Sequence, residues 1–136
     1  CYRWLKMRKV EVGKKELAHY NIGPIVFYEH IYYFKEIFAG KPVTVTLEVS
    51  GLSEDGMYFE FIHKIYDAKG RNCAICEMMG SWIDLEERKL TTLPEELFKQ
   101  LNNSPKTEDF RILTKEDTRK FGKKPQNITP EELKNL

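Results

Sequence analysis

A short helical region changes at once into a long extended one at Asn21-Ile22-Gly23-Pro24-Ile25-Val26, and this switch constrains the fold more than any other feature of the chain. Lys14 to Tyr20 reads as a brief helical turn, followed by an Asn and a Gly that favour a helix C-terminus. Pro24 then prevents the helix from continuing. The next segment, Ile25 to Phe34, is rich in the aromatic and β-branched residues that strands prefer.

Three further segments also read as strands. Val43 to Ser50 alternates cleanly, with its apolar residues on one side and its Thr, Glu and Ser residues on the other. Short turns separate the later segments: a polar turn at Gly51 to Gly56, and a tight turn at Ala68-Lys69-Gly70-Arg71. Because strands joined by short turns are antiparallel neighbours, the sequence predicts an antiparallel sheet. Its four strands are Ile25–Phe34, Val43–Ser50, Met57–Asp67 and Asn72–Asp84.

Helical patterns lie before and after the predicted sheet. Cys1 to Lys9 can place Trp4, Leu5 and Met7 in one apolar stripe, so we expect the sheet to pack against a helix at Tyr2 to Arg8. Pro94 to Asn102 reads as a second helix that starts near its proline. Together these patterns predict the α+β class.

The composition changes after Asn103. Charged residues dominate from Ser104 onward, so we divide the chain into a domain at 1–103 and a charged C-terminal extension at 104–136. Within the extension, Thr129-Pro130-Glu131-Glu132 has the pattern of a capping box with proline at the first helical position. The pattern predicts a last helical turn or two over Thr129 to Leu136.

Composition excludes several classes of function. A chain of 136 residues suits one domain, and its net charge of +1 gives no electrostatic case for binding nucleic acid or an acidic membrane. No apolar run reaches the roughly 20 residues that span a bilayer. The odd count of three cysteines argues against a disulfide framework and fits the cytoplasm. The sequence opens at Cys1 rather than Met, so an upstream signal remains open.

No residue cluster predicts a metal or cofactor. Cys73-Ala74-Ile75-Cys76 has the C-x-x-C spacing, but residues three apart on a strand point to opposite faces, so we expect neither a disulfide nor a zinc site. His19, His30 and His63 are isolated in the sequence. Of these, His63 shares the apolar face of its predicted strand and is the best placed to be buried.

The aromatic residues between Tyr28 and Phe38 exceed what one face of a single sheet can bury. Only Lys35 and Lys41 are interleaved with them, which argues against base stacking on nucleic acid. Large exposed aromatic patches mark protein interfaces, so we predict a symmetric homodimer.

The order and spacing of several short motifs resemble the 4-hydroxybenzoyl-CoA thioesterase-like family of acyl-CoA thioesterases. The resemblance covers Trp4 to Leu97. Its motifs are Ile22-Gly23-Pro24-Ile25-Val26, Ile31 and Tyr33, Gly40 before Val43-Thr44-Val45, Ile65-Tyr66-Asp67 before Lys69-Gly70 and Ala74, Trp82-Ile83-Asp84-Leu85, Arg88-Lys89, and Leu93-Pro94-Glu95-Glu96-Leu97.

The resemblance implies a hotdog fold, in which an antiparallel sheet wraps around a helix and subunits pair into a homodimer or homotetramer. It implies hydrolysis of an acyl-CoA or acyl carrier thioester without a cofactor. In this family an acidic residue before the helix acts as base or nucleophile. The first N–H groups of the helix polarise the thioester carbonyl, as unpaired donors at a positive dipole end can.

Two departures from the family pattern concern the site. Cys1 to Leu5 resembles the middle of the family's helix, and no residue matches the catalytic Asp, so we expect the acid upstream of Cys1 and keep Glu29 and His30 as fallback candidates. Without the family's first strand we also expect an uncovered sheet edge.

The second departure concerns coenzyme A. Some relatives hold its phosphates with basic residues in a turn that is acidic here, Ser53-Glu54-Asp55-Gly56. We take Lys35, Lys41 and Arg71 as substitutes, with Tyr33 beside them.

Two other functions stay open. A non-catalytic hotdog binding or assembly module fits the acidic turn and the unmatched Asp. A hotdog hydratase or dehydratase would need a His and an Asp or Glu near the helix start. The sequence does not distinguish among acyl chain lengths or between coenzyme A and an acyl carrier protein.

Overall fold

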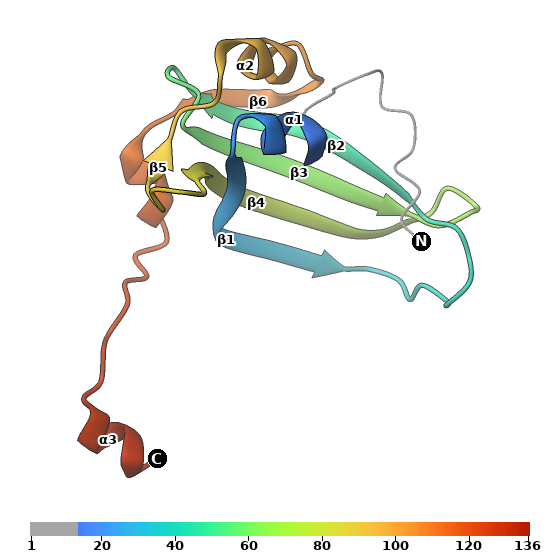
Figure 1. Cartoon of the computed structure of the whole chain (residues 1–136). Helices are drawn as coiled ribbons and strands as arrows, with labels where there is room; N and C mark the ends of the chain where they lie inside the picture. Colours follow the sequence, from blue (N-terminus) through green and yellow to red (C-terminus); the bar gives the residue numbers. More distant parts are fainter. Residues whose placement is uncertain (1–13) are drawn as a thin grey trace.

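The computed structural model describes residues 14–136, and a six-stranded sheet forms its centre (Figure 1). Two helices, α1 and α2, lie over one face of the sheet, which we call the helix face (Figure 1). The elements in chain order are α1 Lys14–His19, β1 Ile22–Tyr33, β2 Thr44–Ser53, β3 Tyr58–Tyr66, β4 Asn72–Asp84, β5 Leu90–Thr91, α2 Glu95–Asn102, β6 Lys106–Leu113, the 3₁₀ helix η1 Lys115–Arg119 and α3 Pro130–Lys134.

The strand order is β1-β4-β3-β2-β6, and β5 pairs with β4. β1 is antiparallel to β4, β4 to β3, and β3 to β2, so the predicted four-stranded antiparallel sheet is confirmed. The predicted α+β class is confirmed as well. The predicted helix at Cys1 to Lys9, and its packing against the sheet, lie outside the described residues.

Two strand boundaries differ from the sequence expectation. β1 begins at Ile22 and includes Pro24. A proline, which cannot donate to the ladder, is tolerated there because β1 lies at the edge of the sheet. β2 continues to Ser53, so the polar turn expected from Gly51 is shorter. A register shift between Val49 and Gly51 bends β2 at that point, which the alternation alone does not reveal.

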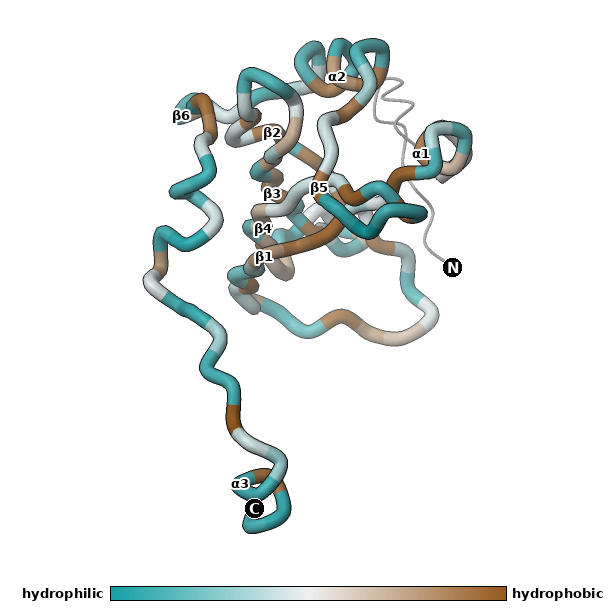
Figure 2. The backbone as a smooth tube through the Cα atoms, turned by 60° about the vertical axis from the view of Figure 1, so that its left-hand side comes forward, coloured by the Kyte–Doolittle hydropathy of each residue, from teal (hydrophilic) through white to brown (hydrophobic). Residues whose placement is uncertain are grey.

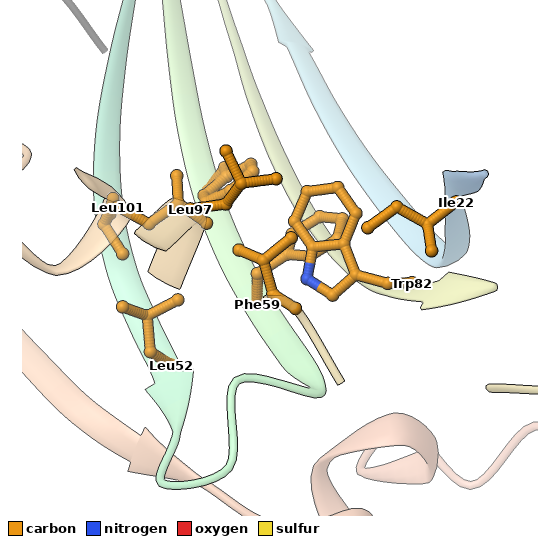
Figure 3. Packing of buried hydrophobic residues seen from close by; sticks show 9 residues of the cluster. Ile22, Leu52, Phe59, Trp82, Leu97 and Leu101 are labelled. Atoms are coloured by element: carbon orange, nitrogen blue, oxygen red, sulfur yellow. The ribbon is translucent and has the colours of Figure 1, made fainter. Parts of the chain in front are cut away.

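The core lies between the helix face and α2 (Figure 3). Phe59 on β3 stacks on Phe61 with ring centroids 4.4 Å apart and tilts against Trp82 of β4 at 4.9 Å. α2 covers these rings with Leu97 and Leu101, which share one side of the helix because they are four residues apart. Each such buried side chain contributes roughly 1.5–3 kcal/mol. The predicted helix at Pro94 to Asn102 is confirmed.

The segment after Asn103 supplies the last strand of the sheet. β6 pairs with β2 in parallel, and the backbone N–H of Val49 donates to the carbonyl of Pro105 at 2.9 Å. Close approach requires Gly51, because a Cβ there would lie 2.7 Å from Leu113 Cδ2. β6 therefore covers the outer edge of β2. The predicted domain boundary falls between α2 and this strand.

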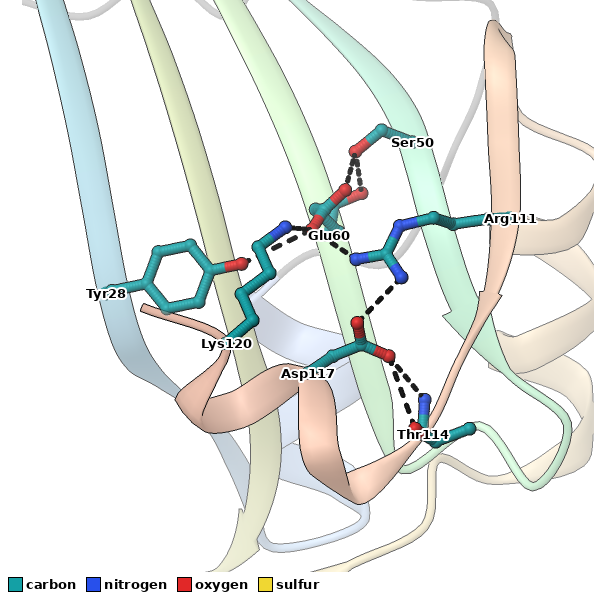
Figure 4. Close-up of polar contacts among 7 residues, drawn as sticks. All are labelled: Tyr28, Ser50, Glu60, Arg111, Thr114, Asp117 and Lys120. Carbon is teal, nitrogen blue, oxygen red and sulfur yellow. Dashed lines mark hydrogen bonds and ion pairs between the residues drawn. The ribbon is translucent and has the colours of Figure 1, made fainter. Parts of the chain in front are cut away.

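Residues 106–121, which we call the strap, join the sheet as β6 and then cross its other face, which we call the strap face (Figure 4). The strap starts as β6 beside β2. It ends with Phe121 against β1, where its ring lies 4.9 Å from Tyr28 and 4.4 Å from His30 between centroids. It therefore links the two edges of the main sheet.

A single carboxylate on β3 holds the middle of the strap (Figure 4). Glu60, whose side chain is 15% exposed, receives hydrogen bonds from Ser50 at 3.0 Å and Tyr28 at 3.4 Å. Two strap cations contact the same side chain, Lys120 at 3.1 Å and Arg111 at 3.5 Å. One acidic group thus joins β1, β2, β3 and the strap.

Asp117 of η1 completes this arrangement. It accepts from Arg111 at 2.6 Å and from the backbone N–H of Thr114 at 2.8 Å. Burial alone would raise the pKa of Asp117, but these two donors outweigh it and hold the pKa below its ordinary value. The hydrogen bond to Asp117 in turn raises the pKa of Arg111. The strap thereby carries its own charge pair in addition to Glu60.

Residues 122–136, which we call the arm, leave the sheet in extended form and end in α3 (Figures 1 and 2). Thr129 caps α3 by accepting from the N–H of Glu132 at 3.2 Å, and Pro130 occupies the first turn. The predicted helical turn at Thr129 to Leu136 is confirmed. Every residue of the arm is exposed.

Replacing Gly80 by Ala should destabilise the fold by about 3 kcal/mol or more. A Cβ at this position of β4 would overlap the carbonyl oxygen of Ile25 and lie 2.6 Å from Phe59 Cζ. Gly23→Ala is the control, since its Cβ would meet only the side chain of Leu85, at 3.2 Å. Urea unfolding measures both. A loss below about 1 kcal/mol for Gly80→Ala would contradict the packing described here.

Replacing Glu60 by Gln should loosen the strap and lower the free energy of unfolding by about 1–2 kcal/mol, because the largely buried carboxylate that Arg111 and Lys120 share loses its charge, while these two cations are themselves partly exposed to solvent. The amides of residues 106–121 should then exchange hydrogen faster than those of β3. Glu48→Gln is the matched control: Glu48 forms a more exposed pair with Lys64 at 2.9 Å and should cost under about 1 kcal/mol. Equal effects of the two substitutions would contradict a special role for Glu60.

Candidate functional site

A trough with a volume of about 610 Å³ lies on the helix face, beyond the packed core. Met78 belongs to both, because it packs against the core cluster and also lines the trough. The walls are mostly apolar and come from all four long strands. They include Ile31, Val43, Val45, Ile65 and Ala74. A trough of this size and lining can hold an acyl chain or another small apolar group.

Strand alternation explains why these residues gather there. Ile65 of β3 pairs with Val45 of β2 on one side and with Ala74 of β4 on the other. Ala74 in turn pairs with Tyr33 of β1. Since directly paired residues of neighbouring strands point to the same face, one row across the sheet supplies one wall of the trough.

Three groups with acid, base or thiol chemistry line the trough: Glu29, His63 and Cys76. His63 pairs with Cys76, and Cys76 pairs with Ile31, two residues along β1 from Glu29. Burial lowers the pKa of His63, although its backbone hydrogen bond to Thr46 and the charge of Glu29 oppose the shift. At neutral pH the imidazole is therefore an uncharged acceptor or donor.

The thiol of Cys76 is held in its protonated form. Burial raises its pKa, and the negative charges of Glu29 and Glu77 add to that effect. A raised pKa lowers the thiolate fraction and with it the nucleophilicity of the sulfur. Cys76 thus forms part of the wall rather than an activated nucleophile, while Glu29 and His63 can move protons at a molecule held in the trough.

The two fallback candidates face opposite sides of the sheet. Glu29 lines the trough, whereas His30 lies on the strap face against Phe121. The structure therefore groups Glu29 with His63 instead of with its neighbour in sequence. The sequence indicated that His63 lies on an apolar face, but it did not indicate that Glu29 lies near that histidine, because their separation depends on β4 lying between β1 and β3.

The residues expected to bind coenzyme A lie at one end of the sheet. Tyr33 ends β1 and lines the trough, and the N–H of Lys35 donates to the carbonyl of Cys73 at 3.2 Å in the loop that follows. Lys41 lies later in that loop and is exposed. Arg71 is already paired with Asp67 at 2.7 Å in the turn between β3 and β4. Lys35 and Lys41, by contrast, form no salt bridge with any of residues 14–136.

Residues 14–136 contain neither a cluster of metal-ligating side chains nor a membrane-spanning helix. Within these residues, no three His, Cys, Asp or Glu side chains come together to hold a metal ion. Cys73 and Cys76 are free. None of the helices in this range is long and apolar enough to cross a membrane.

Comparison with solved structures places this sheet and helix arrangement among the hotdog proteins. A hypothetical protein from Staphylococcus aureus, solved in complex with CoA, is similar over 69% of this chain and 61% of its own, with 22% identity and a TM-score of 0.57. A 1,4-dihydroxy-2-naphthoyl-CoA thioesterase from Synechocystis is similar over 69% of each chain, with 17% identity and a TM-score of 0.55. A DHNA-CoA thioesterase from Staphylococcus aureus is similar over 68% of this chain and 65% of its own, with 16% identity and a TM-score of 0.57.

The chain thus spans less than two thirds of the two Staphylococcus aureus proteins. No curated protein matches the chain. The family model of the thioesterase-like superfamily matches residues 2–101, which is most of the sequence and includes every strand that lines the trough. This match confirms the resemblance drawn from the sequence motifs. The chain has the hotdog fold and belongs to the thioesterase-like superfamily.

Proposed function

We propose that the protein is an acyl-CoA thioesterase that holds its acyl group in the trough. The observation that carries the proposal is an apolar trough of about 610 Å³ with one carboxylate and one neutral imidazole in its lining, in a chain of this superfamily. Two similar structures are CoA thioesterases and a third was solved with CoA bound, which supports this substrate class.

The lining suggests how the substrate would be seated. The acyl group would lie against Val45, Ile65 and Met78, where transfer from water is favourable by roughly 25 cal/mol per Å². The coenzyme end would point toward the end of β1, where Lys35 and Lys41 can meet its phosphates. Tyr33, which is 81% exposed, would cover the link between the two parts.

Hydrolysis needs a base that activates water and donors that stabilise the tetrahedral oxyanion. On the family resemblance, the acid that serves as base would lie upstream of Cys1, in the loop before the helix whose first N–H groups would be the donors. Glu29 is the candidate within this sequence, because its carboxylate lines the trough. Both arrangements end with the thiolate of coenzyme A leaving as the carbonyl re-forms.

We expect a protein that includes residues upstream of Cys1 to release thiol from short or medium acyl-CoA. The protein beginning at Cys1 should be at least about 10²-fold slower, the typical effect of losing one oxyanion donor. A thiol-release assay on both proteins across acyl lengths measures this. Equal rates would place the base inside this sequence. Glu29→Gln should then lower kcat about 10²-fold or more, and Glu77→Gln, whose register places it on the strap face, should leave kcat unchanged.

Absence of thiol release from both proteins at every acyl length would contradict the thioesterase proposal and favour the non-catalytic binding module. The presence of both Glu29 and His63 in the lining of the trough favours a hydratase or dehydratase as the second candidate function. A hydratase adds water across the double bond of an enoyl-CoA without releasing thiol, so enoyl-CoA substrates of the same chain lengths, monitored for loss of the enoyl chromophore, separate the two activities.

We also propose a cytoplasmic homodimer that pairs through the β1 edge. Among the described strands, β1 bonds only to β4, so its outer backbone groups are free to pair. Exposed aromatic side chains continue from this edge into the next loop, among them Tyr32, Phe34 and Phe38. A second dimer contact would give the homotetramer seen in some hotdog proteins. The free thiols fit a reducing compartment.

Sedimentation should show a dimer at about 20 µM protein, a concentration at which obligate dimers persist. Phe34→Glu should shift the sample to monomer, because a charge would be buried in the interface. Ile112→Glu is the control: Ile112 is comparably exposed, on β6 at the opposite edge. A monomeric wild-type protein, or loss of the dimer in the control alone, would contradict the assignment to β1.

A further inference from the structure

A second hollow, of about 710 Å³, lies on the strap face where η1 approaches the start of β3 and β5. Its floor is apolar and comes from Phe27, Tyr58 and Leu90. The rings of Phe27 and Tyr58 lie 6.3 Å apart between centroids, and Tyr58 is buried whereas Phe27 and Leu90 are exposed. We call this site the strap hollow.

The rim of the strap hollow carries cations that lack a partner in the described residues. Lys115, Arg119 and Lys124 line it, and none of them has a carboxylate within salt-bridge distance in residues 14–136. The neighbouring strap cations differ, because Arg111 and Lys120 are paired with Glu60 or Asp117. Glu116 is the acidic residue in the described lining. The rim therefore has a positive excess that residues 14–136 do not neutralise.

The arm carries the complementary groups. Its apolar side chains Ile128, Leu133 and Leu136 are 51%, 61% and 93% exposed. Glu131 and Glu132 lie in the first turn of α3. A five-residue helix is marginal in water, even with the Thr129 cap, and needs apolar burial to persist. The strap hollow offers an apolar floor for the leucines and a basic rim for the glutamates.

The path of the arm points away from its own hollow. The strap ends with Phe121 on Tyr28 of β1, so the arm departs at the β1 edge. From Lys124, which lines the hollow, the backbone runs extended to Thr129 with no turn that would bring α3 back. The β1 edge is also the surface we propose as the homodimer interface, so a second copy lies in the direction that the arm takes.

We propose that α3 of one chain docks in the strap hollow of a second copy, with Leu133 and Leu136 on the apolar floor and Glu131 and Glu132 against Lys115 and Arg119. In a two-fold dimer each chain gives one arm and receives one. This proposal rests on the homodimer proposed above but not on thioester hydrolysis.

Cross-linking between two populations of chains tests the proposal, each with one introduced cysteine and with the native Cys1, Cys73 and Cys76 replaced by Ala. Chains with Leu133→Cys are mixed with chains with Leu90→Cys, treated with a short bismaleimide and digested for mass spectrometry. The expected result is a peptide that joins position 133 to position 90, and this link can form only between two chains. Ile112→Cys replaces Leu90→Cys as the control. It lies on β6 at the far edge of the sheet and should give at least tenfold less linked peptide.

Charge exchange gives the second readout. Lys115→Glu with Arg119→Glu in the Leu90→Cys chains should lower the linked peptide at least tenfold. Adding Glu131→Lys with Glu132→Lys to the Leu133→Cys chains should restore it. These side chains are exposed, so the fold should persist, and circular dichroism checks this.

Three outcomes would overturn the proposal. The link between positions 133 and 90 could be absent while sedimentation still shows a dimer. The link could be insensitive to both charge reversals. A doubly substituted chain, Leu90→Cys with Leu133→Cys, could close the link within itself at high dilution, which would place α3 in its own hollow. None of these outcomes bears on thiol release, so the thioesterase proposal is tested separately.

Discussion

Alternation along β3 is the constraint on which the rest of the structure depends. Its odd-numbered residues point to the helix face, where Phe59 and Phe61 form the core and His63 continues the row into the trough. Its even-numbered residues point to the strap face, where Glu60 holds the strap. A slip of one residue in this central strand would exchange the two sets and place a carboxylate in the core.

The sequence predicted what depends on local pattern. Four strands, α2 and the capped turn at Thr129 follow from period-two alternation, turn residues and helix-start residues, which act over a few positions. β6 was not predicted, because half of its sequence, KTEDFRIL, is charged and its pairing partner Val49 lies far away in the chain. The start of β1 was missed because Pro24 normally ends regular structure, and only a position at the sheet edge allows it in a strand.

The candidate site also has features that local pattern predicts and features that depend on distant strands. The motifs were sufficient for the superfamily, and the face of His63 followed from alternation. The proximity of Glu29 and His63 did not, because it depends on β4 lying between β1 and β3. Nor did the sequence show that Arg71 is already engaged with Asp67. The turn geometry of the folded chain decides which cations remain available for a substrate.

The parallel pairing of β6 with β2 has a consequence for the order in which the chain folds. β2 can pair with β3 as soon as the hairpin has been synthesised, but among the described strands none covers its other edge until β4, β5, α2 and finally β6 have followed. During that interval a bent, half-apolar edge is available to other nascent chains, which is the usual origin of co-translational aggregation. The charges of KTEDFRIL then have a second use: once β6 docks, the new outer edge is one that another strand pairs with poorly. Docking of β6 thus replaces a sheet edge that other strands can pair with by a charged edge that they pair with poorly.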